Sequence, residues 1–556
     1  MYNLLIGGAA GQGVDTTAVI LEKLLKRSGY STFTTKDLMS RVRGGHNYSL
    51  IRFGTKAVYS HSNRLDGIIA LNDETVELHR DKLNPNGFIL CDSTLATNDP
   101  RCIKLNMGEM AKALGNPRVF GSIAVGVILK LFGENLDYVP DVLRLFVKEQ
   151  FFDVNLQAVE KGYQSVENRF PHLQGAFGDY MLLTGSKALS LGAMAAGLKF
   201  YSAYPMSPST VIMEYLASKS DEAGIVVEQA EDEIAAINMA IGASYVGTRA
   251  MTGTSGGGFS LMVEALGLSG MAEIPLVVVD VQRPGPVTGL PTRTEQSDLK
   301  FVISASQGEF PRMVIALRNH TDAFYQTIRA FHLAEKYQIP VILLSDQYLG
   351  DSSATVKPYD LSNIKVATPA TTYDGEDEYL RYQYTEDGIS PRLLPGKTKN
   401  FVSIDSDEHN ERGWITESSE VRNKMMDKRM KKLEKLNQEL QEPEFIGLDD
   451  FDTLFIGWGS TYGPIAEAVE LLNEKGGGKY AALVFGDVYP LPQNLLQEKT
   501  KAAHRIINIE QNATGQLADL IREQTGIICT KSILKYDGRQ ISGEEIAEQM
   551  QKEDLK

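Results

Sequence analysis

The sequence predicts an α/β protein with several domains, each built around a mostly parallel sheet. The chain has 556 residues, and this length corresponds to about three to four domains of ordinary size. Short apolar runs alternate with stretches of helical periodicity, an alternation typical of strand–helix–strand units. Glycine-rich loops follow several of the predicted strands, where α/β sheets commonly bind ligands.

The first domain is expected over residues 1–178. The run YNLLIG at 2–7 predicts a strand, the loop GAAGQG follows at 8–13, and a helical pattern covers 16–29. Turn residues interrupt the pattern around 175–185, and we expect a domain boundary there.

A second domain is expected over residues 185–358. Its predicted elements are, in order, helix 188–198, strand 225–229, helix 233–246, strand 248–253, helix 259–270, and strands 275–282 and 340–346. This order of apolar strands and helices predicts a buried parallel sheet.

A connector and a third, smaller domain are expected after the second one. The apolar periodicity weakens over 359–447, and residues 421–444 form a charged amphipathic pattern within this connector. Strand and helix patterns resume over 448–556, which predicts a smaller α/β domain.

Composition argues against two classes of partner. The net charge of −15 and a pI near 5.2 leave no basic surface for nucleic acid. No apolar run approaches the roughly 18 residues of a membrane span, and the first residues lack the basic segment of a signal peptide. We therefore expect a cytoplasmic protein without nucleic-acid or membrane partners.

The cysteines restrict the redox chemistry of the chain. It has three cysteines, at positions 91, 102 and 529, without C-x-x-C spacing. They cannot ligate a four-cysteine cluster alone, so any iron–sulfur centre is expected on a partner chain.

Two segments of the first domain could bind a phosphate. Gly11 and Gly13 stand between a predicted strand and helix, where backbone N–H groups can hold a phosphate. Arg43 lies in the glycine-containing cationic loop SRVRGGHN. The spacing matches neither a dinucleotide fingerprint nor a Walker loop, and a tight turn or a solvated loop explains these residues equally well.

The stretch YPMSPST predicts a stiff turn between a strand and a helix. Pro205 and Pro208 hold the residues before them extended, so that the hydroxyl of Ser207 is presented on a fixed turn. Ser209 or Thr210 can cap the helix that follows, whose N-terminus would attract a small anion. An ordinary strand-to-helix turn is the alternative.

An acidic cluster opens the next predicted helix. Glu231, Asp232 and Glu233 precede the apolar stretch IAAI. Acids in a first helical turn usually stabilise the helix dipole. If the helix is buried, however, Glu233 would be desolvated and suited to sharing a proton with a heterocyclic nitrogen.

Further candidates follow two later strands. Thr254 and Ser255 precede three glycines, which would let a ligand approach the backbone closely. Arg283 and Arg293 lie in a long loop rich in proline and glycine, and an arginine there could hold a carboxylate with two hydrogen bonds. A surface ion pair of Arg293 with Glu295 is the alternative.

These motifs together resemble the α subunit of the 2-oxoacid:ferredoxin oxidoreductases. The matching stretches are YPMSPST, EDEIAAINMAIGAS, TSGGGFSLMVEALG, GPVTGLPTRTEQSDL, DEHNERG and IEQNATGQL. Residues 1–178 resemble the γ subunit of that family, fused N-terminally as in the 2-oxoglutarate type. The resemblance implies a transketolase-like domain for the pyrimidine of thiamine diphosphate at 185–358 and a transketolase C-terminal-like domain at 448–556.

The resemblance also implies roles for the candidate residues. Glu233 corresponds to the catalytic glutamate that hydrogen-bonds the aminopyrimidine of thiamine diphosphate, and Ser207 to the hydroxyl residue that contacts the 2-oxoacid. Arg293 corresponds to the arginine that binds the substrate carboxylate, with Arg283 as the weaker candidate. The other implied cofactor-binding residues are Tyr204, Pro205, Thr254 and Ser255 around thiamine diphosphate, and Gly11, Gly13 and Arg43 on the coenzyme A side.

The resemblance further implies a second subunit. This chain lacks the G-D-G motif that holds Mg²⁺ and the diphosphate, since the Gly-Asp pairs at 178–179 and 486–487 are followed by Tyr180 and Val488. We therefore expect no metal on this chain and a β subunit that carries Mg²⁺ and a [4Fe-4S] cluster and shares the thiamine diphosphate. Coenzyme A is the implied co-substrate and ferredoxin the implied electron acceptor.

The implied reaction is the oxidative decarboxylation of a 2-oxoacid, with 2-oxoglutarate favoured by the order of the domains. Pyruvate, branched-chain or aryl 2-oxoacids are alternative substrates within the same family. A function of another class, a noncatalytic scaffold subunit that binds a nucleotide at the GGAAGQG loop, is also left open by the residues alone.

Overall fold

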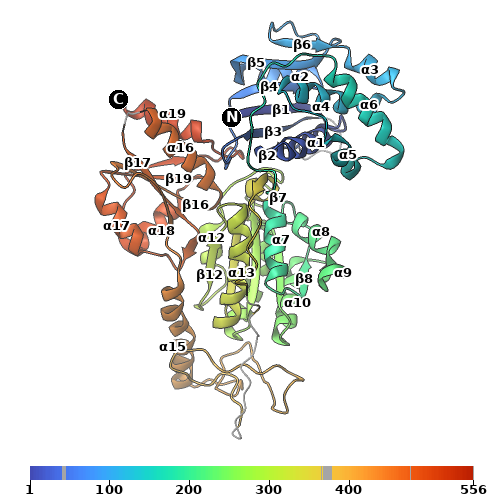
Figure 1. Cartoon of the computed structure of the whole chain (residues 1–556). Coiled ribbons are helices and arrows are strands. Elements are labelled where there is room, and N and C mark those ends of the chain that lie inside the picture. The colour runs from blue at the N-terminus through green and yellow to red at the C-terminus, as the bar shows by residue number, and fades with distance from the viewer. Residues whose placement is uncertain (40–44, 365, 367–377, 476–477, 555–556) are drawn as a thin grey trace. The chain divides into compact units, whose positions relative to one another are not determined.

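A computed structural model describes residues 1–39, 45–364, 366, 378–475 and 478–554. The chain forms two compact units (Figure 1), which are treated separately here. Unit 1 comprises residues 1–184 and 351–358, and unit 2 comprises 185–350 and 359–556. The predicted α/β class with several largely parallel sheets is confirmed.

Unit 1 is built on an eight-stranded sheet with the order β6-β5-β4-β1-β3-β2-β14-β7. Its strands are β1 (Tyr2–Ala9), β2 (Ser31–Asp37), β3 (His46–Gly54), β4 (Leu65–Ala70), β5 (Leu83–Asp92), β6 (Cys102–Leu105), β7 (Met181–Thr184) and β14 (Ser353–Val356). Strand β1 is parallel to β4 and antiparallel to β3. Strand β14, although it follows residues 185–350 of unit 2 in the chain, completes this sheet between β2 and β7.

Six α-helices accompany this sheet in the described part of unit 1. They are α1 (Val14–Arg27), α2 (Asp73–His79), α3 (Met107–Ala113), α4 (Phe120–Leu131), α5 (Val139–Phe146) and α6 (Phe152–Tyr163). Helices α4 and α6 pack with their backbones in close contact, because a Cβ atom on Gly126 would collide with the carbonyl oxygen of Val159. Small residues are required at such a crossing.

The larger sheet of unit 2 has seven strands in the order β18-β12-β13-β11-β10-β8-β9. They are β8 (Phe200–Ala203), β9 (Val226–Gln229), β10 (Ala250–Thr254), β11 (Leu276–Gln282), β12 (Met313–Ala316), β13 (Pro340–Asp346) and β18 (Asp487–Tyr489). All neighbouring pairs are parallel except β12 with β18. The carboxyl ends of β8, β10 and β11 therefore meet at one edge of the sheet, which positions the candidate site.

The helices of this part are α7 (Gly185–Ala195), α8 (Thr210–Ser218), α9 (Ser220–Ala223), α10 (Glu233–Tyr245), α11 (Gly256–Met271), α12 (Leu299–Ile303), α13 (His320–Tyr337) and α14 (Gln347–Asp351). Helices α7 and α13 lie side by side (Figure 1), and Gly192 contacts the backbone of Phe324 at their crossing. Helix α11 begins three residues before the predicted Phe259, because Ser255 is its N-cap and the glycines form the first turn.

The second sheet of unit 2 has five strands in the order β15-β17-β16-β19-β20. They are β15 (Glu444–Gly447), β16 (Thr453–Trp458), β17 (Tyr480–Phe485), β19 (Arg505–Glu510) and β20 (Lys531–Leu534). The accompanying helices are α16 (Tyr462–Lys475), α17 (Asn494–Ala502), α18 (Gln516–Thr525) and α19 (Gly543–Asp554). The side-chain amide of Gln296 donates to the carbonyl oxygen of Trp458 at 2.8 Å and thereby links this sheet to the loop after β11.

The charged helix of the connector is α15 (Ser419–Leu436). Its apolar stripe is narrow, and two of its lysines are nevertheless buried because they reach the carboxylate of Glu273. Lys428 Nζ lies 2.6 Å from Glu273 Oε1, and Lys432 Nζ lies 2.5 Å from Oε2. These ion pairs hold α15 against the segment that follows α11, since a buried charge requires an opposite charge nearby.

Candidate functional site

The three glycines at the start of α11 let the helix approach two acidic side chains. A Cβ atom on Gly258 would lie 2.5 Å from Oε1 of Glu233 and would also collide with the hydroxyl of Thr254. A Cβ atom on Gly256 would lie 2.5 Å from Oδ2 of Asp298. Glycine is therefore needed at both positions for this packing, and the turn brings Glu233 and Thr254 together.

The three acids at the start of α10 have different environments. Glu231 is exposed, whereas Asp232 is the N-cap and accepts a hydrogen bond from the backbone N–H of Ala235 at 2.7 Å. Glu233 is only 3% exposed. Glu233 is thus buried, the condition set for its proposed role, and Asp232 is the residue that caps the helix.

Oε1 of Glu233 is buried and has no hydrogen-bond partner among the described residues. A buried polar atom without a partner destabilises a fold by about 1–3 kcal/mol, so such atoms are rare unless a ligand satisfies them. The unpartnered Oε1 fits a ligand with a hydrogen-bonding nitrogen atom.

The YPMSPST turn lies between the end of β8 and the start of α8. Ser207 is exposed, and its backbone carbonyl accepts a hydrogen bond from Nη1 of Arg283 at 2.6 Å. The hydroxyl of Thr254 lies 3.8 Å from the sulfur of Met206, within hydrogen-bond distance for sulfur. The structure therefore joins the Ser207 turn to both Arg283 and Thr254.

The side chains of the turn differ from the sequence prediction in one respect. Ser209 occupies the N-cap position of α8, but its hydroxyl donates back to the carbonyl of Met206 at 2.8 Å and caps no helical N–H. Tyr204 is 40% exposed, and Pro205 is half-buried. The first N–H groups of α8 consequently lack a side-chain cap.

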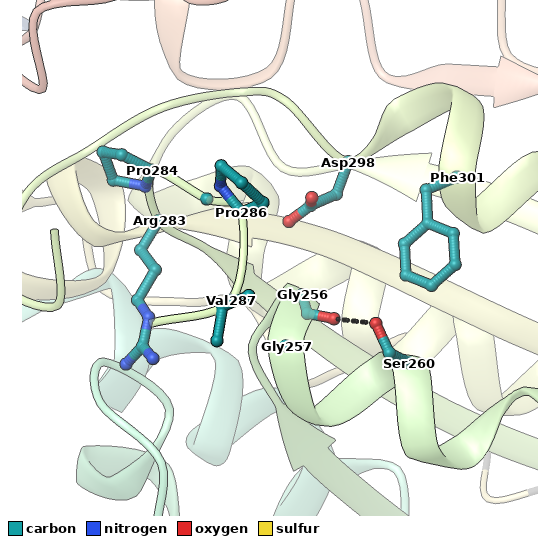
Figure 2. A pocket seen from close by; sticks show the side chains of 10 residues that line it. Gly256, Gly257, Ser260, Arg283, Pro284, Pro286, Val287, Asp298 and Phe301 are labelled. Carbon is teal, nitrogen blue, oxygen red and sulfur yellow. Dashed lines mark hydrogen bonds between the residues drawn. The ribbon is translucent and has the colours of Figure 1, made fainter. Parts of the chain in front are cut away.

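A cavity of about 220 Å³ adjoins the first turn of α11 (Figure 2). It is lined by Gly256, Gly257, Ser260, Arg283, Pro284, Gly285, Pro286, Val287, Asp298 and Phe301. Arg283 stands on one wall and Asp298 on the other (Figure 2). The cavity thus combines a cation and a helix N-terminus, which attract a small anionic ligand, with one acid, Asp298, whose charge opposes that attraction.

The two candidate arginines differ in their surroundings. Nη1 of Arg293 donates to the carbonyl of Thr292 at 3.1 Å, and a Cβ atom on Gly538 would lie 3.1 Å from Cβ of Arg293. Arg293 therefore packs against a loop after the five-stranded sheet. Arg283, the weaker candidate from the sequence, is the arginine that lines the cavity and reaches the Ser207 turn.

The glycine loop of unit 1 leaves room for a ligand. Gly11 and Gly13 have φ values of 91° and 82°, and a Cβ atom on either would meet no atom within 4 Å. Gly13 is the N-cap of α1 and provides no side-chain cap. Arg43, the third candidate of this unit, lies outside the described residues.

Asp298, which lines the cavity, is a site residue that the sequence analysis missed, and Asp280 is a buried acid that it also missed. Asp280 lies in the mostly apolar stretch of β11, where a buried acid is the signal that could have identified it.

Within the described ranges no three or more His, Cys, Asp or Glu side chains cluster so as to hold a metal ion. The same ranges contain no helix of sufficient length and apolarity to span a membrane.

Two family models match the chain. Residues 3–165 match the model described as "Pyruvate ferredoxin/flavodoxin oxidoreductase". Residues 191–428 match the model described as "Pyruvate flavodoxin/ferredoxin oxidoreductase, thiamine diP-bdg", a range that includes Glu233 and the turn of α11. A thiamine diphosphate-binding domain therefore contains the site described above.

Curated relatives match the chain over almost all of its length. The chain is 34% identical to the "2-oxoacid:ferredoxin oxidoreductase subunit alpha" of Sulfolobus sp., over 98% of this chain and 95% of the relative. It is 32% identical to the "2-oxoglutarate oxidoreductase subunit KorA" of Mycobacterium tuberculosis, over 77% of this chain and 67% of the relative.

A solved structure has the same fold throughout. The "2-oxoglutarate:ferredoxin oxidoreductase from Magnetococcus marinus with 2-oxoglutarate, coenzyme A and succinyl-CoA bound" superposes with a TM-score of 0.94 at 31% identity, and the match covers 100% of this chain and 99% of that one. The sequence relationship and the shared fold agree with the motifs around Glu233 and Ser207. The chain is a member of the 2-oxoacid:ferredoxin oxidoreductase family of enzymes and belongs to its alpha subunits.

Proposed function

We propose that this chain is the α subunit of an oxidoreductase that converts 2-oxoglutarate and coenzyme A to an acyl-CoA and CO₂ and passes the electrons to ferredoxin. The single observation that carries the proposal is the unpartnered Oε1 of Glu233, buried at the start of α10. The match of residues 191–428 to a thiamine diphosphate-binding model supports this use of the carboxyl group.

Glu233 fits the aminopyrimidine of thiamine diphosphate. When bound, this cofactor supplies the electron sink for decarboxylation of a 2-oxoacid. Glu233 would hold a proton between Oε1 and a ring nitrogen, and its burial keeps water from competing for that hydrogen bond. Tyr204, Pro205, Thr254 and Ser255 would complete this side of the pocket.

Arg283 and Ser207 are proposed to bind the substrate. Arg283 lines the cavity and fixes the Ser207 turn through the hydrogen bond to the Ser207 carbonyl. A second N–H edge of the guanidinium can bind a carboxylate, as planar arginine groups commonly do. Arg293 is kept as the alternative carboxylate-binding residue.

The choice of 2-oxoglutarate rests on the relatives. The Magnetococcus marinus enzyme binds 2-oxoglutarate, coenzyme A and succinyl-CoA. Two further relatives, of Mycobacterium tuberculosis and Methanocaldococcus jannaschii, are named for 2-oxoglutarate, the latter at 36% identity over 60% of this chain and 89% of its own length. Pyruvate and other 2-oxoacids are the alternative substrates.

A partner subunit is proposed from the surface of α10 and α11. Ile234, Met239, Val246 and Leu261 are large apolar residues that are between 42% and 50% exposed. Exposed apolar residues along neighbouring helices are typical of a protein interface. We assign this face to a β subunit that shares the thiamine diphosphate and carries Mg²⁺ and a [4Fe-4S] cluster, which the cysteines of this chain cannot ligate.

The glycine loop of unit 1 is proposed to serve coenzyme A. The open space beside Gly11 and Gly13 and the uncapped N-terminus of α1 suit a phosphate group. Arg43 would add a positive charge to that loop.

Reconstitution tests the proposed function. The chain is expressed with a candidate β subunit that bears a G-D-G motif and cluster cysteines, and the reduction of ferredoxin is measured with coenzyme A and either 2-oxoglutarate, pyruvate, a branched-chain or an aryl 2-oxoacid. We expect activity only with both subunits, with the largest kcat/KM for 2-oxoglutarate. A larger kcat/KM for another 2-oxoacid would reassign the substrate. The absence of activity with all of them would favour the alternative function of a noncatalytic scaffold subunit.

A further inference from the structure

The loop that lines the cavity is closed at its base by a hydrogen bond. It runs from Arg283 to Asp298, between β11 and α12, and residues from both of its ends line the cavity (Figure 2). The backbone N–H of Asp298 donates to Oε1 of Gln282 at 3.1 Å and thereby joins the two ends. Inside the loop, the N–H of Leu290 donates to the carbonyl of Pro284 at 3.0 Å. These bonds fix the shape of the loop, so its position depends on contacts with other segments.

The side-chain amide of Gln296 holds this loop against the five-stranded sheet. Gln296 is 1% exposed. Its Nε2 donates to the carbonyl oxygen of Trp458 at 2.8 Å, and its Oε1 accepts from the backbone N–H of Gln511 at 3.2 Å. Trp458 is the last residue of β16, and Gln511 directly follows β19. Because β16 and β19 are parallel neighbours, the amide lies between the carboxyl ends of two adjacent strands and bonds to both, as a peptide group of a further strand would.

The backbone of Gln296 is bound to the same place. Its N–H donates to the carbonyl of Gln511 at 2.8 Å, and its carbonyl accepts from Nδ2 of Asn512 at 3.0 Å. Gly459, which directly follows β16, has a φ of 54°, and a Cβ atom on it would lie 3.0 Å from Nε2 of Gln296. Glycine at this position leaves room for the amide, so the sequence of the sheet is adapted to this contact.

Residues on both sides of this anchor add contacts with the same domain. The N–H of Thr294 donates to the carbonyl of Gly538 at 3.2 Å. The side-chain amide of Gln516 donates to the carbonyl of Ser297 at 2.8 Å and accepts from the N–H of Lys300 at 2.9 Å. The segment 294–300 is therefore docked on the five-stranded sheet and its helix α18.

The docked segment occupies the place where a sheet of this kind usually binds a ligand. Ligands of open α/β sheets bind beyond the carboxyl ends of the strands, at the point where the strand order reverses. That point lies between β16 and β19, since β17 follows on one side of β16 and β19 lies on the other, and Gln296 fills it. The N-terminus of α18 is also in use, because the N–H groups of Leu517 and Ala518 donate to Oε1 of Glu510 at 2.9 and 3.2 Å.

We propose that Gln296 is a positioning residue for substrate binding, and that the five-stranded sheet holds the cavity loop at its switch point in place of a ligand. The loop carries Arg283 and Arg293, the two candidates for binding the substrate carboxylate. Gln296 itself is assigned no contact with substrate or cofactor and acts through the loop. The inference rests on the proposed function, because it concerns the arginines assigned to the substrate, but the anchoring of the loop can be measured without activity.

Two substitutions release the loop from opposite sides. Gln296→Ala removes the amide between β16 and β19. Gln516→Ala removes the hydrogen bonds to Ser297 and Lys300 from a half-buried position, so this variant remains informative if the first one folds poorly.

Asn473→Ala is the matched control. The amide of Asn473 also bonds two backbone groups of this sheet, accepting from the N–H of Tyr480 at 2.9 Å and donating to its carbonyl at 3.0 Å. Tyr480 is the first residue of β17, so this amide lies at the amino ends of the strands, at the edge opposite the docked loop.

Hydrogen exchange of the full chain, without substrate or cofactor, measures the anchoring. We expect the amides of residues 284–298 to exchange roughly 10-fold faster in Gln296→Ala, because two buried hydrogen bonds of the docked loop are lost. The increase should be smaller in Gln516→Ala and absent in Asn473→Ala. Unchanged exchange of these amides in both loop variants would overturn the proposal.

Kinetics in the complex with the β subunit measure the positioning role. We expect the KM for 2-oxoglutarate to rise about 10-fold in Gln296→Ala and less in Gln516→Ala, while the KM for coenzyme A stays at its wild-type value and Asn473→Ala lowers only Tm. A merely structural role would lower the apparent kcat together with Tm and leave both KM values unchanged, and this result would overturn the positioning role. If the wild-type complex converts no 2-oxoacid, the proposed function fails and the positioning role with it, whereas hydrogen exchange still decides whether Gln296 anchors the loop.

Discussion

Gly258 and Glu233 are in direct contact, and a Cβ atom on Gly258 would lie 2.5 Å from Oε1 of Glu233. The two residues belong to the first turns of neighbouring helices, α11 and α10. Because Oε1 has no other partner among the described residues, the position of this oxygen is controlled by packing against a glycine rather than by a hydrogen bond.

This contact predicts the effect of Gly258→Ala. The added methyl group should displace the Glu233 carboxyl and reduce kcat roughly 10- to 100-fold, the usual effect of misplacing a catalytic group. The overpacking should also lower the free energy of unfolding by about 1–3 kcal/mol. Gly178→Ala, where a Cβ atom would meet no atom within 4 Å, is the control in kcat and Tm measurements. A Gly258→Ala variant with the kcat of the wild type would show that the site tolerates this displacement.

Glu233→Gln tests the carboxyl itself. Glutamine preserves the size of the side chain but cannot exchange a proton with the cofactor, so turnover in the complex with the β subunit should fall about 10²- to 10⁴-fold. Glu231→Gln is the matched control, because Glu231 is exposed two residues earlier. Turnover is measured at saturating thiamine diphosphate, and assembly is checked by gel filtration. Equal losses in the two variants would mean that these acids only stabilise the start of α10 and that Glu233 has no catalytic role.

Arg283→Ala tests the substrate carboxylate. Loss of a charge-assisted hydrogen bond of about 1.5–3 kcal/mol should raise KM about 10- to 100-fold for every 2-oxoacid. Arg293→Ala should change KM less, because Arg293 packs against the Gly538 loop. KM is measured for 2-oxoglutarate and pyruvate with each variant. The opposite order of effects would assign the carboxylate to Arg293.

Local patterns predicted much of the fold and the main parts of the site. Alternating strands and helices indicated the parallel sheet, and the apolar residues after Glu233 indicated its burial, because both signals depend on neighbours in the chain. The three glycines also indicated close approach of another group. Which groups approach them, Asp298 and Glu233, depends on the tertiary packing.

Contacts between distant segments explain the remaining differences. Asp298 and Gly256, which pack together, are far apart in the sequence, so no short motif contains both. The return of β14 to the sheet of unit 1 joins residues 353 and 34, and four residues without a strong pattern give no indication of that pairing. The preference for Arg293 over Arg283 came from a resemblance of motifs and stays a prediction, whereas the hydrogen bond from Arg283 to the Ser207 carbonyl depends on how two loops meet.

The last prediction concerns Glu22, a buried acid of unit 1 that lies outside the proposed active site. Glu22 is 2% exposed on α1, and the hydroxyl of Thr32 lies 3.5 Å from its Oε1. Burial raises the pKa of Glu22 to about 7, and hydrogen bonds from neighbouring hydroxyl groups oppose the shift only in part. The protonated form therefore stabilises the fold below the pKa of the unfolded chain, and this contribution is lost as pH rises through about 7.

Glu22→Gln should remove that dependence, because glutamine keeps the shape and stays neutral. At about pH 8 the variant should have a higher Tm than the wild type, by an amount equivalent to at most about 3 kcal/mol, and at about pH 5 the difference should largely vanish. The Tm of the full chain is measured across this range, with Glu160→Gln at an exposed position of α6 as the control. If the difference in Tm between Glu22→Gln and the wild type is the same at both pH values, Glu22 does not titrate there, and its carboxyl must be ionised throughout.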